Sequence, residues 1–272
     1  MKTIVLATDF SANAKQAAHF AAQLTRDQKA RLILVHAFHV WPDNPAKTGD
    51  FSLSVQATKE SSEKALKHLT DELRKEVGAD VSIEYIAREG HTMNAIRAIT
   101  TEKNADLLIM STVGTAPKSA QLMGSIATEM VEETDVPLLL IPPGVGYAGI
   151  KNIVLGVDLA TPPNALALET ALLFAKSFGS VINVLCISEH PENPELKERG
   201  EYIRRLLIPQ PHTLSIVAGH EVYTTLLDFS VENKADLIMM LPQSRSWLWK
   251  LFAEGETQHV ARLTDLPLLA IV

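Results

Sequence analysis

The chain of 272 residues is 46% apolar and 21% charged, with a formal net charge of −7, which is typical of an ordinary globular protein. Acidic and basic residues are spread evenly over both halves, so binding to nucleic acid or to a membrane surface is not expected. No apolar run approaches the roughly 18 residues of a membrane span, and Asp9 interrupts the first run too early for a signal peptide, so we expect a cytoplasmic protein.

The first half alternates short apolar runs with helical patterns. Short continuous runs rich in Val, Ile and Leu are typical of parallel strands that are buried on both faces. They predict strands at Thr3–Thr8, Arg31–Ala37, Val81–Ile86, Leu107–Ser111 and Leu138–Ile141. The intervening patterns predict helices from an N-cap at Ser11 to Leu24, and over Val55–Val77, Met93–Glu102 and Gly124–Glu133.

The second half repeats the first. Two strings recur at the same offset of 130 residues, and a third string, nearer the start of the chain, recurs at an offset of 149. The offset becomes smaller along the chain because the middle of the first half is longer than that of the second. The strings are Ile4–Asp9 with Ile153–Asp158, Ala105–Met110 with Ala235–Met240, and Thr134–Leu139 with Thr264–Leu269. Pro142–Gly149 has the composition of a linker, which predicts one domain over residues 1–143 and another over residues 150–272.

The predicted helices of the second half match those of the first. One begins at Thr161-Pro162, and the others cover Glu195–Leu207, Val222–Asn233 and Glu256–Leu263. Strands that alternate with helices through short connections imply right-handed βαβ crossovers. The predicted fold is therefore of the α/β class, with two tandem, open, mostly parallel, doubly wound five-stranded sheets.

Ligands of a doubly wound sheet bind at the carboxyl ends of its strands. The segment after the fourth strand carries Gly114 and Gly124 on either side of a polar loop, and Gly124-Ser125 starts a helix. Glycine allows close approach of the backbone, and the free N–H groups at a helix N-terminus suit a phosphate. The alternative is a structural turn without a ligand, and Asp9 after the first strand is either a ligand contact or a turn cap near Ser11.

These residues resemble the nucleotide-binding signature of the universal stress protein family: Gly, two residues, Gly, nine residues, then Gly-Ser or Gly-Thr. Here Ser111 replaces the first glycine, and Gly114 and Gly124-Ser125 follow at the same spacing. The string Thr8–Ser11 resembles the family's first-strand exit, whose Asp contacts adenine, and Val35–Ala37 resembles the segment against which adenine packs.

The resemblance implies a tandem universal stress protein with an adenine nucleotide α-hydrolase-like fold. It implies ATP or another adenine nucleotide, with or without Mg²⁺, as the ligand of the first half. The implied contacts to base or ribose are Ala7, Thr8, Asp9 and Ala37, and those to ribose and phosphates are Met110, Ser111, Gly114, Gly124, Ser125 and Ile126.

The second half departs from this signature. Its equivalent positions hold Leu241, Ser244, Glu254 and Gly255, and a carboxylate at Glu254 would repel a phosphate. We therefore expect no nucleotide in the second half, although Asp158 follows its first strand. The bulky cluster of Trp247, Trp249 and Phe252 either packs over the changed pocket or forms a base-stacking or acyl-binding surface.

Each half ends in an apolar strand that follows a proline. Such a strand at a sheet edge invites association unless it is covered. In the family these strands pair across a two-fold axis, which implies that Leu138–Ile141 is buried against Leu268–Val272 in an intramolecular pseudo-dimer. A homodimer of whole chains remains open.

Catalytic patterns are sparse in the sequence. It contains no Gly-x-Ser-x-Gly elbow and no Walker motif, and its nine histidines show no metal-ligand spacing. We expect His36 to be a hydrogen-bonded structural residue and the lone Cys186 to be a buried, inert thiol. The hypothesis is a stress-response or signalling protein that binds nucleotide with at most weak ATP hydrolysis. The alternative is a nucleotide-independent interaction or small-molecule-binding module.

Overall fold

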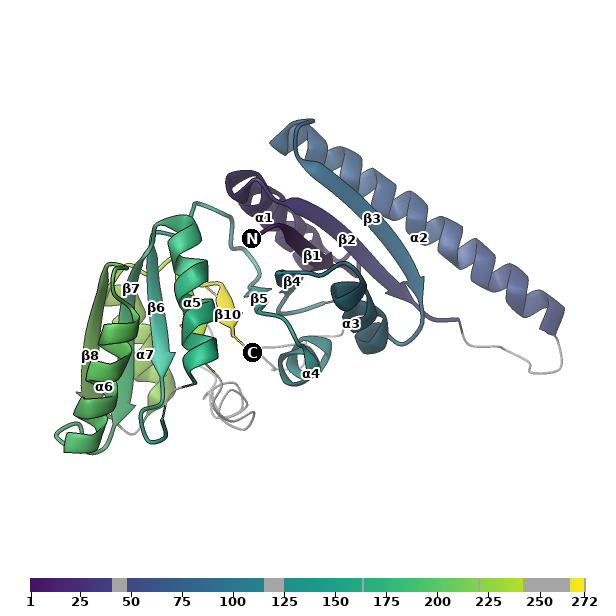
Figure 1. Ribbon diagram of the computed structural model, residues 1–272. Helices are drawn as coiled ribbons and strands as arrows, with labels where there is room; N and C mark the ends of the chain where they lie inside the picture. The colour runs from purple at the N-terminus through teal and green to yellow at the C-terminus, as the bar shows by residue number, and fades with distance from the viewer. Residues whose placement is uncertain (41–47, 115–124, 163, 220, 242–264, 272) are drawn as a thin grey trace.

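The computed structural model describes residues 1–40, 48–114, 125–162, 164–219, 221–241 and 265–271. In this part of the chain, ten strands form one sheet in the order β3-β2-β1-β4-β5-β10-β9-β6-β7-β8 (Figure 1). The strands are β1 Thr3–Ala7, β2 Arg31–Phe38, β3 Ser82–Glu89, β4 Leu107–Ser111, β5 Leu138–Ile141, β6 Asn152–Val157, β7 Val181–Ser188, β8 His212–Ala218, β9 Leu237–Met240 and β10 Leu268–Ala270. The predicted α/β class with a mostly parallel sheet is confirmed.

Seven helices connect the strands in the described residues. They are α1 Ala12–Gln28, α2 Thr48–Val77, α3 Thr92–Glu102, α4 Ser125–Glu133, α5 Ala165–Phe178, α6 Pro194–Leu206 and α7 Val222–Glu232. The longer middle of the first half is largely α2, which has 30 residues where α6 has 13. In Figure 1, α2 extends past the ends of β2 and β3.

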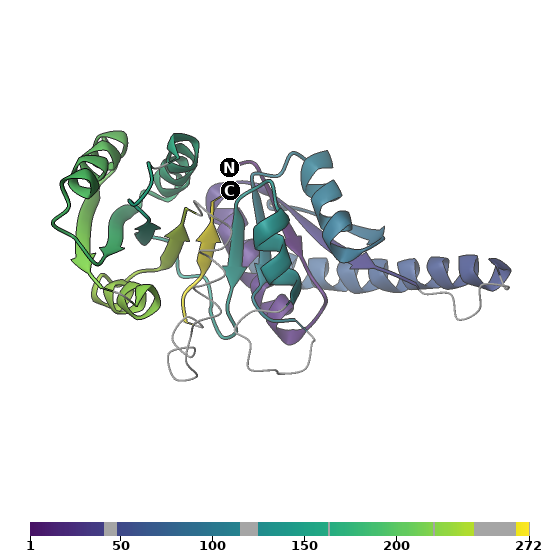
Figure 2. The ribbon, with the colours of Figure 1, turned by 90° about the horizontal axis from the view of Figure 1, so that it is seen from below.

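The last strands of the two halves join the sheet at its centre. β5 and β10 are antiparallel, with Leu138 opposite Ala270 and Leu140 opposite Leu268, whereas every other strand pair is parallel. Figure 2 shows β10 in yellow between β9 and β5. The expected pairing of Leu138–Ile141 with the end of the chain is therefore present over Leu268–Ala270.

The two faces of the sheet carry separate apolar cores. One core packs beneath α1, α2, α5 and α6, and it includes side chains of β5 and β10 such as Leu139 and Leu269. The other lies beneath α3, α4 and α7 and takes the alternate side chains, such as Leu140 and Leu268. Because both cores run through the β5–β10 junction, the halves share apolar packing as well as hydrogen bonds.

Several element boundaries differ from the predicted ones. The helix expected at Thr161-Pro162 begins later, because the side chain of Asn164 accepts hydrogen bonds from the amides of Leu166 and Ala167 and so forms the N-cap. Helix α2 begins at Thr48 rather than Val55. The predicted helix over residues 256–263 lies outside the described residues.

The segment between the halves packs against α1. The amide of Gly144 donates to Oε1 of Gln16 at 2.9 Å, and the ring of Tyr147 meets Phe20 edge-on at 5.1 Å between centroids. Burial, together with the neighbouring Asp27, raises the pKa of Tyr147. This segment therefore has fixed contacts although its composition is that of a linker.

Candidate functional site

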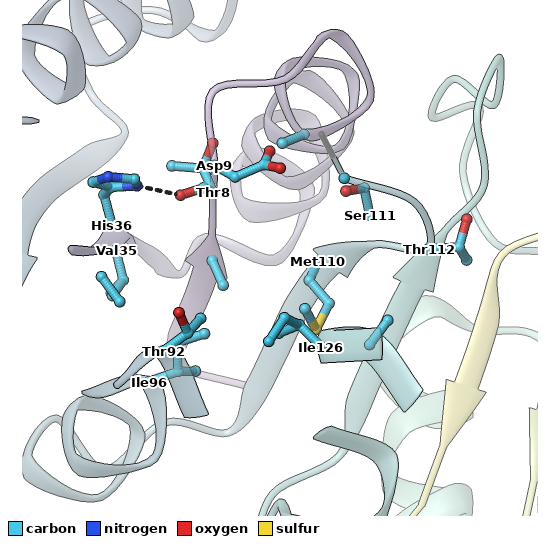
Figure 3. A pocket seen from close by; sticks show the side chains of 15 residues that line it. Thr8, Asp9, Val35, His36, Thr92, Ile96, Met110, Ser111, Thr112 and Ile126 are labelled. Carbon is cyan, nitrogen blue, oxygen red and sulfur yellow. Dashed lines mark hydrogen bonds between the residues drawn. The ribbon is translucent and has the colours of Figure 1, made fainter. Parts of the chain in front are cut away.

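A cavity of about 280 Å³ lies at the carboxyl ends of β1, β2 and β4 (Figure 3). Its walls come from these strand ends and from the first turns of α1, α3 and α4. Eight residues singled out in the sequence line this cavity: Ala7, Thr8, Asp9, Ala37, Met110, Ser111, Gly114 and Ile126. The topology thus brings together residues from three segments that are far apart in the chain.

The turn after β1 fixes the direction of the Asp9 side chain. Oδ1 of Asp9 accepts a hydrogen bond from the amide of Ser11 at 3.0 Å, and Oγ1 of Thr8 accepts one from the amide of Phe10 at 3.1 Å. The hydroxyl of Ser11 then accepts from the amide of Ala14 and forms the N-cap of α1. Asp9 therefore does cap the turn through one oxygen, and its other oxygen lies toward the loop after β4.

Gly114 is placed where only a glycine fits without a shift. A Cβ added at Gly114 would lie 2.6 Å from Oδ2 of Asp9. The loop is held close by Asn13, whose side-chain amide donates to the carbonyl of Val113 at 3.2 Å. Figure 3 shows the Asp9 carboxylate on the side of the cavity that faces Ser111. The small residue at position 114 thus keeps a carboxylate oxygen accessible at the cavity wall.

His36 forms one end of the cavity. Its Nδ1 lies 2.8 Å from the carbonyl oxygen of Thr8, and its ring packs against Phe10 with centroids 4.5 Å apart. Because a carbonyl can only accept, Nδ1 is the donor of this hydrogen bond. The expected hydrogen bond of His36 is present, and the same residue also lines the cavity.

Comparison with known proteins gives the family. The family model described as the universal stress protein family matches residues 1–142. The chain belongs to the universal stress protein family. A universal stress protein of Thermus aquaticus is 30% identical over 146 residues, which cover 52% of this chain and 98% of that protein. A universal stress protein of Methanocaldococcus jannaschii is 29% identical over 142 residues, or 52% of this chain and 81% of that protein.

The fold likeness extends over both halves of this universal stress protein. The crystal structure of a universal stress protein from Archaeoglobus fulgidus has a TM-score of 0.75, with 98% of this chain and 97% of that chain covered at 16% identity. The family model ends at residue 142, before β6, and the likeness of the second half is one of fold.

Two residues of the predicted signature are described only in part or not at all. Ser125 is the first residue of α4, where the sequence places a helix start. Gly124 lies outside the described residues. Ile126 and Ala127, in the first turn of α4, line the cavity, so the N-terminal end of this helix is at the cavity wall.

The sequence did not single out the contribution of α3. Thr92 and Ile96, one helical turn apart, line the cavity opposite β4 (Figure 3). A signal was available, because α3 follows β3, whose carboxyl end lies at the same edge of the sheet as those of β1 and β2. The remaining lining residues that were missed are Ala14, Thr112 and Ala127.

The second half of this universal stress protein has a smaller cavity, of about 210 Å³, at the equivalent strand ends. It is lined by Gly156, Val157, Asp158, Leu185, Ile187, Val222 and Leu226. Leu241 is buried at the position equivalent to Ser111. The other departures noted in the sequence (Ser244, Glu254, Gly255, Trp247, Trp249 and Phe252) lie outside the described residues.

Other groups give no additional centre in the described part of the chain. No three His, Cys, Asp or Glu side chains gather there in a way that could hold a metal ion. Cys186 is buried, as expected, and burial raises the pKa of its thiol. Among the described residues, no helix is long and apolar enough to cross a membrane.

Proposed function

We propose that this universal stress protein binds ATP or a related adenine nucleotide in its first half and acts in stress response or signalling through binding rather than efficient turnover. The observation that carries the proposal is the convergence of eight of the ten predicted contact residues on one cavity at the strand ends. Family membership supports it.

The cavity has separate parts for the base and for the polar groups of a nucleotide. Val35, Ala37 and Ile96 offer an apolar wall for a purine ring. The Asp9 carboxylate can accept a hydrogen bond from an exocyclic amine or a ribose hydroxyl, and the His36 ring, which also lines the cavity, can form another through Nε2.

The phosphate end would lie toward Gly114 and the start of α4. The helix N-terminus presents free backbone N–H groups there, and Ser111 and Thr112 add hydroxyls. Because Gly114 has no side chain, the space beside the Asp9 carboxylate stays open, and a Cβ there would clash with that carboxylate. Mg²⁺ would arrive with the phosphates, held by their oxygens and by water.

A nucleotide-independent interaction module is the second candidate, and Ser111 favours it. This side chain stands where the family signature has glycine, and it lines the cavity at 8% exposure. If it crowds the ribose, a Ser111→Gly variant gains nucleotide affinity. If it donates a hydrogen bond to the ribose, the same variant loses affinity.

Calorimetric titration of the full chain with ATP, ADP and AMP tests the proposal. Saturable heat with one site per chain is the expected result. Absence of both heat and a thermal shift at millimolar nucleotide would exclude nucleotide binding and leave the interaction module. Phosphate release measured alongside, against a protein-free blank, tests whether any hydrolysis accompanies binding.

A glycine pair provides the matched variants. In Gly114→Ala, the new methyl group would displace the Asp9 carboxylate, so we expect nucleotide affinity to fall about tenfold, the equivalent of one charge-assisted hydrogen bond. Gly146→Ala is the control, since a Cβ at Gly146 meets nothing within 4 Å. Equal affinities of the two variants would remove Asp9 and Gly114 from the site.

We also propose that residues 1–143 and 150–272 are two domains that form an intramolecular pseudo-dimer. The antiparallel β5–β10 pair divides the described sheet into two sets of five strands, one set from each half of the chain, which supports this division. Cleavage by a protease confined to residues 143–149, with the two fragments still associated afterwards, is the expected result.

A further inference from the structure

An open groove of about 470 Å³ lies between the first turn of α1 and the middle of α2. The described residues that line it differ from those that line the cavity at the strand ends. Leu69 is buried in the groove, and Phe10 and Ala65 are half-buried, so these side chains form an apolar floor. A hollow of this size that has an apolar floor suits a small organic ligand.

Phe10 is held in the groove by an unfavourable backbone conformation. Its φ is 61°, in the left-handed region that a bulky residue rarely adopts. Its amide donates to Oγ1 of Thr8 at 3.1 Å, and its ring packs against His36 with centroids 4.5 Å apart. His36 lines the nucleotide cavity and Phe10 lines the groove. A strained residue that separates two hollows is typical of a functional position.

The second half has a different residue at the equivalent place. Counted back from β3 and β8, which begin at residues 82 and 212, Leu69 of α2 corresponds to Arg199 of α6. Nη1 of Arg199 donates to the carbonyls of Leu159 and Ala160 at 2.6 Å each. Leu159, the counterpart of Phe10, is fully buried. An arginine therefore joins helix and turn in the second half, whereas a leucine leaves the space open in the first.

The charged side chains of the groove leave an excess of positive charge on α2. Nζ of Lys15 lies 2.8 Å from Oε1 of Glu72, and the hydrogen bond from Lys15 holds the pKa of Glu72 below its usual range. This carboxylate is therefore already paired. Lys64 and His68 lie one helical turn apart, are exposed and also line the groove. Within the described part of the chain, Lys64 forms no ion pair.

We propose that the groove between α1 and α2 binds small apolar carboxylic acids. The carboxylate would lie at Lys64 and His68, and the hydrocarbon body against the apolar floor. A charge-assisted hydrogen bond is stronger than a neutral one, so the acid is preferred over a neutral analogue of the same shape. An apolar amine is disfavoured because like charges repel. This site goes beyond the nucleotide site proposed for the first half and does not depend on it.

Three probes of similar size and different charge test the proposal on the full chain. 3-Phenylpropionate carries a carboxylate, 3-phenylpropanol a neutral hydroxyl and 3-phenylpropylamine an ammonium group on the same ring and chain. In calorimetric titrations we expect 3-phenylpropionate to bind one site per chain, 3-phenylpropanol to bind about tenfold more weakly, and the amine not to bind. Equal affinity for the acid and the alcohol, or no binding of the acid at millimolar concentration, would overturn the proposal.

Two matched lysine variants locate the carboxylate. Lys64→Gln removes the charge at the groove, so it is expected to weaken 3-phenylpropionate binding about tenfold and leave 3-phenylpropanol unchanged. Lys67→Gln makes the same change at an exposed position of α2 that is not among the lining residues, and it is expected to leave both probes unchanged. Equal effects of the two variants on 3-phenylpropionate would reduce Lys64 to a general charge effect and refute the assignment.

A third variant fills the groove itself. Ala65 is half-buried on α2 and lines the groove, so Ala65→Phe places a ring where the hydrocarbon body of the acid would lie. We expect it to weaken both 3-phenylpropionate and 3-phenylpropanol about tenfold, with ATP titration and thermal unfolding as controls for the nucleotide cavity and the fold. Full retention of 3-phenylpropionate binding in a folded Ala65→Phe protein would contradict the proposed position of the hydrocarbon body.

Discussion

One recurring aspartate holds the start of the central strand in each half. Oδ2 of Asp106 accepts hydrogen bonds from the amides of Lys2 at 2.6 Å and Thr3 at 2.8 Å. In the second half, Oδ2 of Asp236 accepts from the amides of Lys151 and Asn152 at 2.8 and 2.9 Å. The substitution Asp106→Ala would leave two backbone donors at the start of β1 without this acceptor.

The expected cost follows from the burial of those donors. The amide of Lys2 is exposed and can donate to water instead, so the loss of its hydrogen bond to Asp106 costs little free energy of unfolding. Thr3 is only 4% exposed, and a buried donor that loses a charged acceptor costs about 1.5–3 kcal/mol. We therefore expect Asp106→Ala to lower the free energy of unfolding by about 2 kcal/mol, which corresponds to a fall in Tm of roughly 4–8 °C.

Urea and thermal unfolding of a small variant series provide the assay. Asp106→Asn retains an oxygen acceptor without the charge, so about half the loss is expected. Asp236→Ala is expected to match Asp106→Ala, and the double variant to show their sum if the joined sheet unfolds as one cooperative unit. A free energy of unfolding for Asp106→Ala within about 0.5 kcal/mol of the wild type would refute the reasoning.

Three further substitutions probe the packing of the first half. Although burial acts to raise it, hydrogen bonds from His19 and Gln23 hold the pKa of Glu76 below its ordinary value of 4.5. The carboxylate therefore stabilises the fold above that pH, and this effect is lost as the pH falls through its lowered pKa. We expect Glu76→Gln to cost about 0.5–1 kcal/mol at pH 7 and less at pH 3, measured by urea unfolding. Lys29 is a left-handed helix C-cap with φ of 50°, so Lys29→Gly is expected to raise stability by about 1 kcal/mol, and a fall in Tm would contradict this. Leu66 is fully buried, so Leu66→Ala is expected to cost about 2–5 kcal/mol in the same measurement.

The strand ends could be placed from sequence because local patterns determine them. Continuous apolar runs located β1, β2, β4 and β5 within a residue or two, and the rule that ligands bind at carboxyl ends then brought Asp9 and Gly114 to one cavity. Contacts between distant segments carry no comparable local signal. The repeated Ala-Asp-Leu string was visible, but the hydrogen bonds that Asp106 accepts from backbone amides about a hundred positions earlier were not.

Helix starts were predicted less well, because several residues near a boundary can cap a helix. Thr161-Pro162 matches the pattern of a helix start as well as Asn164 does, but the side chain of Asn164 accepts from two amides. Thr92 was missed for a different reason. Whether the first turn of a helix contacts the cavity depends on the angle at which the helix crosses the sheet. The hydrophobic periodicity of α3 does not predict that angle.

The two halves share the contacts that hold the backbone and differ in the side chains that face the cavities. Asp106 and Asp236 accept the same backbone hydrogen bonds at the start of the central strand of each half. In the cavities, by contrast, Thr8 of the first half is replaced by Val157 at the equivalent position of the second. Backbone donors at a strand start require an acceptor whatever the protein binds, so those residues follow from the fold. Cavity side chains are under no such requirement. The replacement of Thr8 by Val157 at equivalent positions therefore bears on what the cavity of each half can bind, whereas the paired aspartates at the strand starts follow from the fold alone.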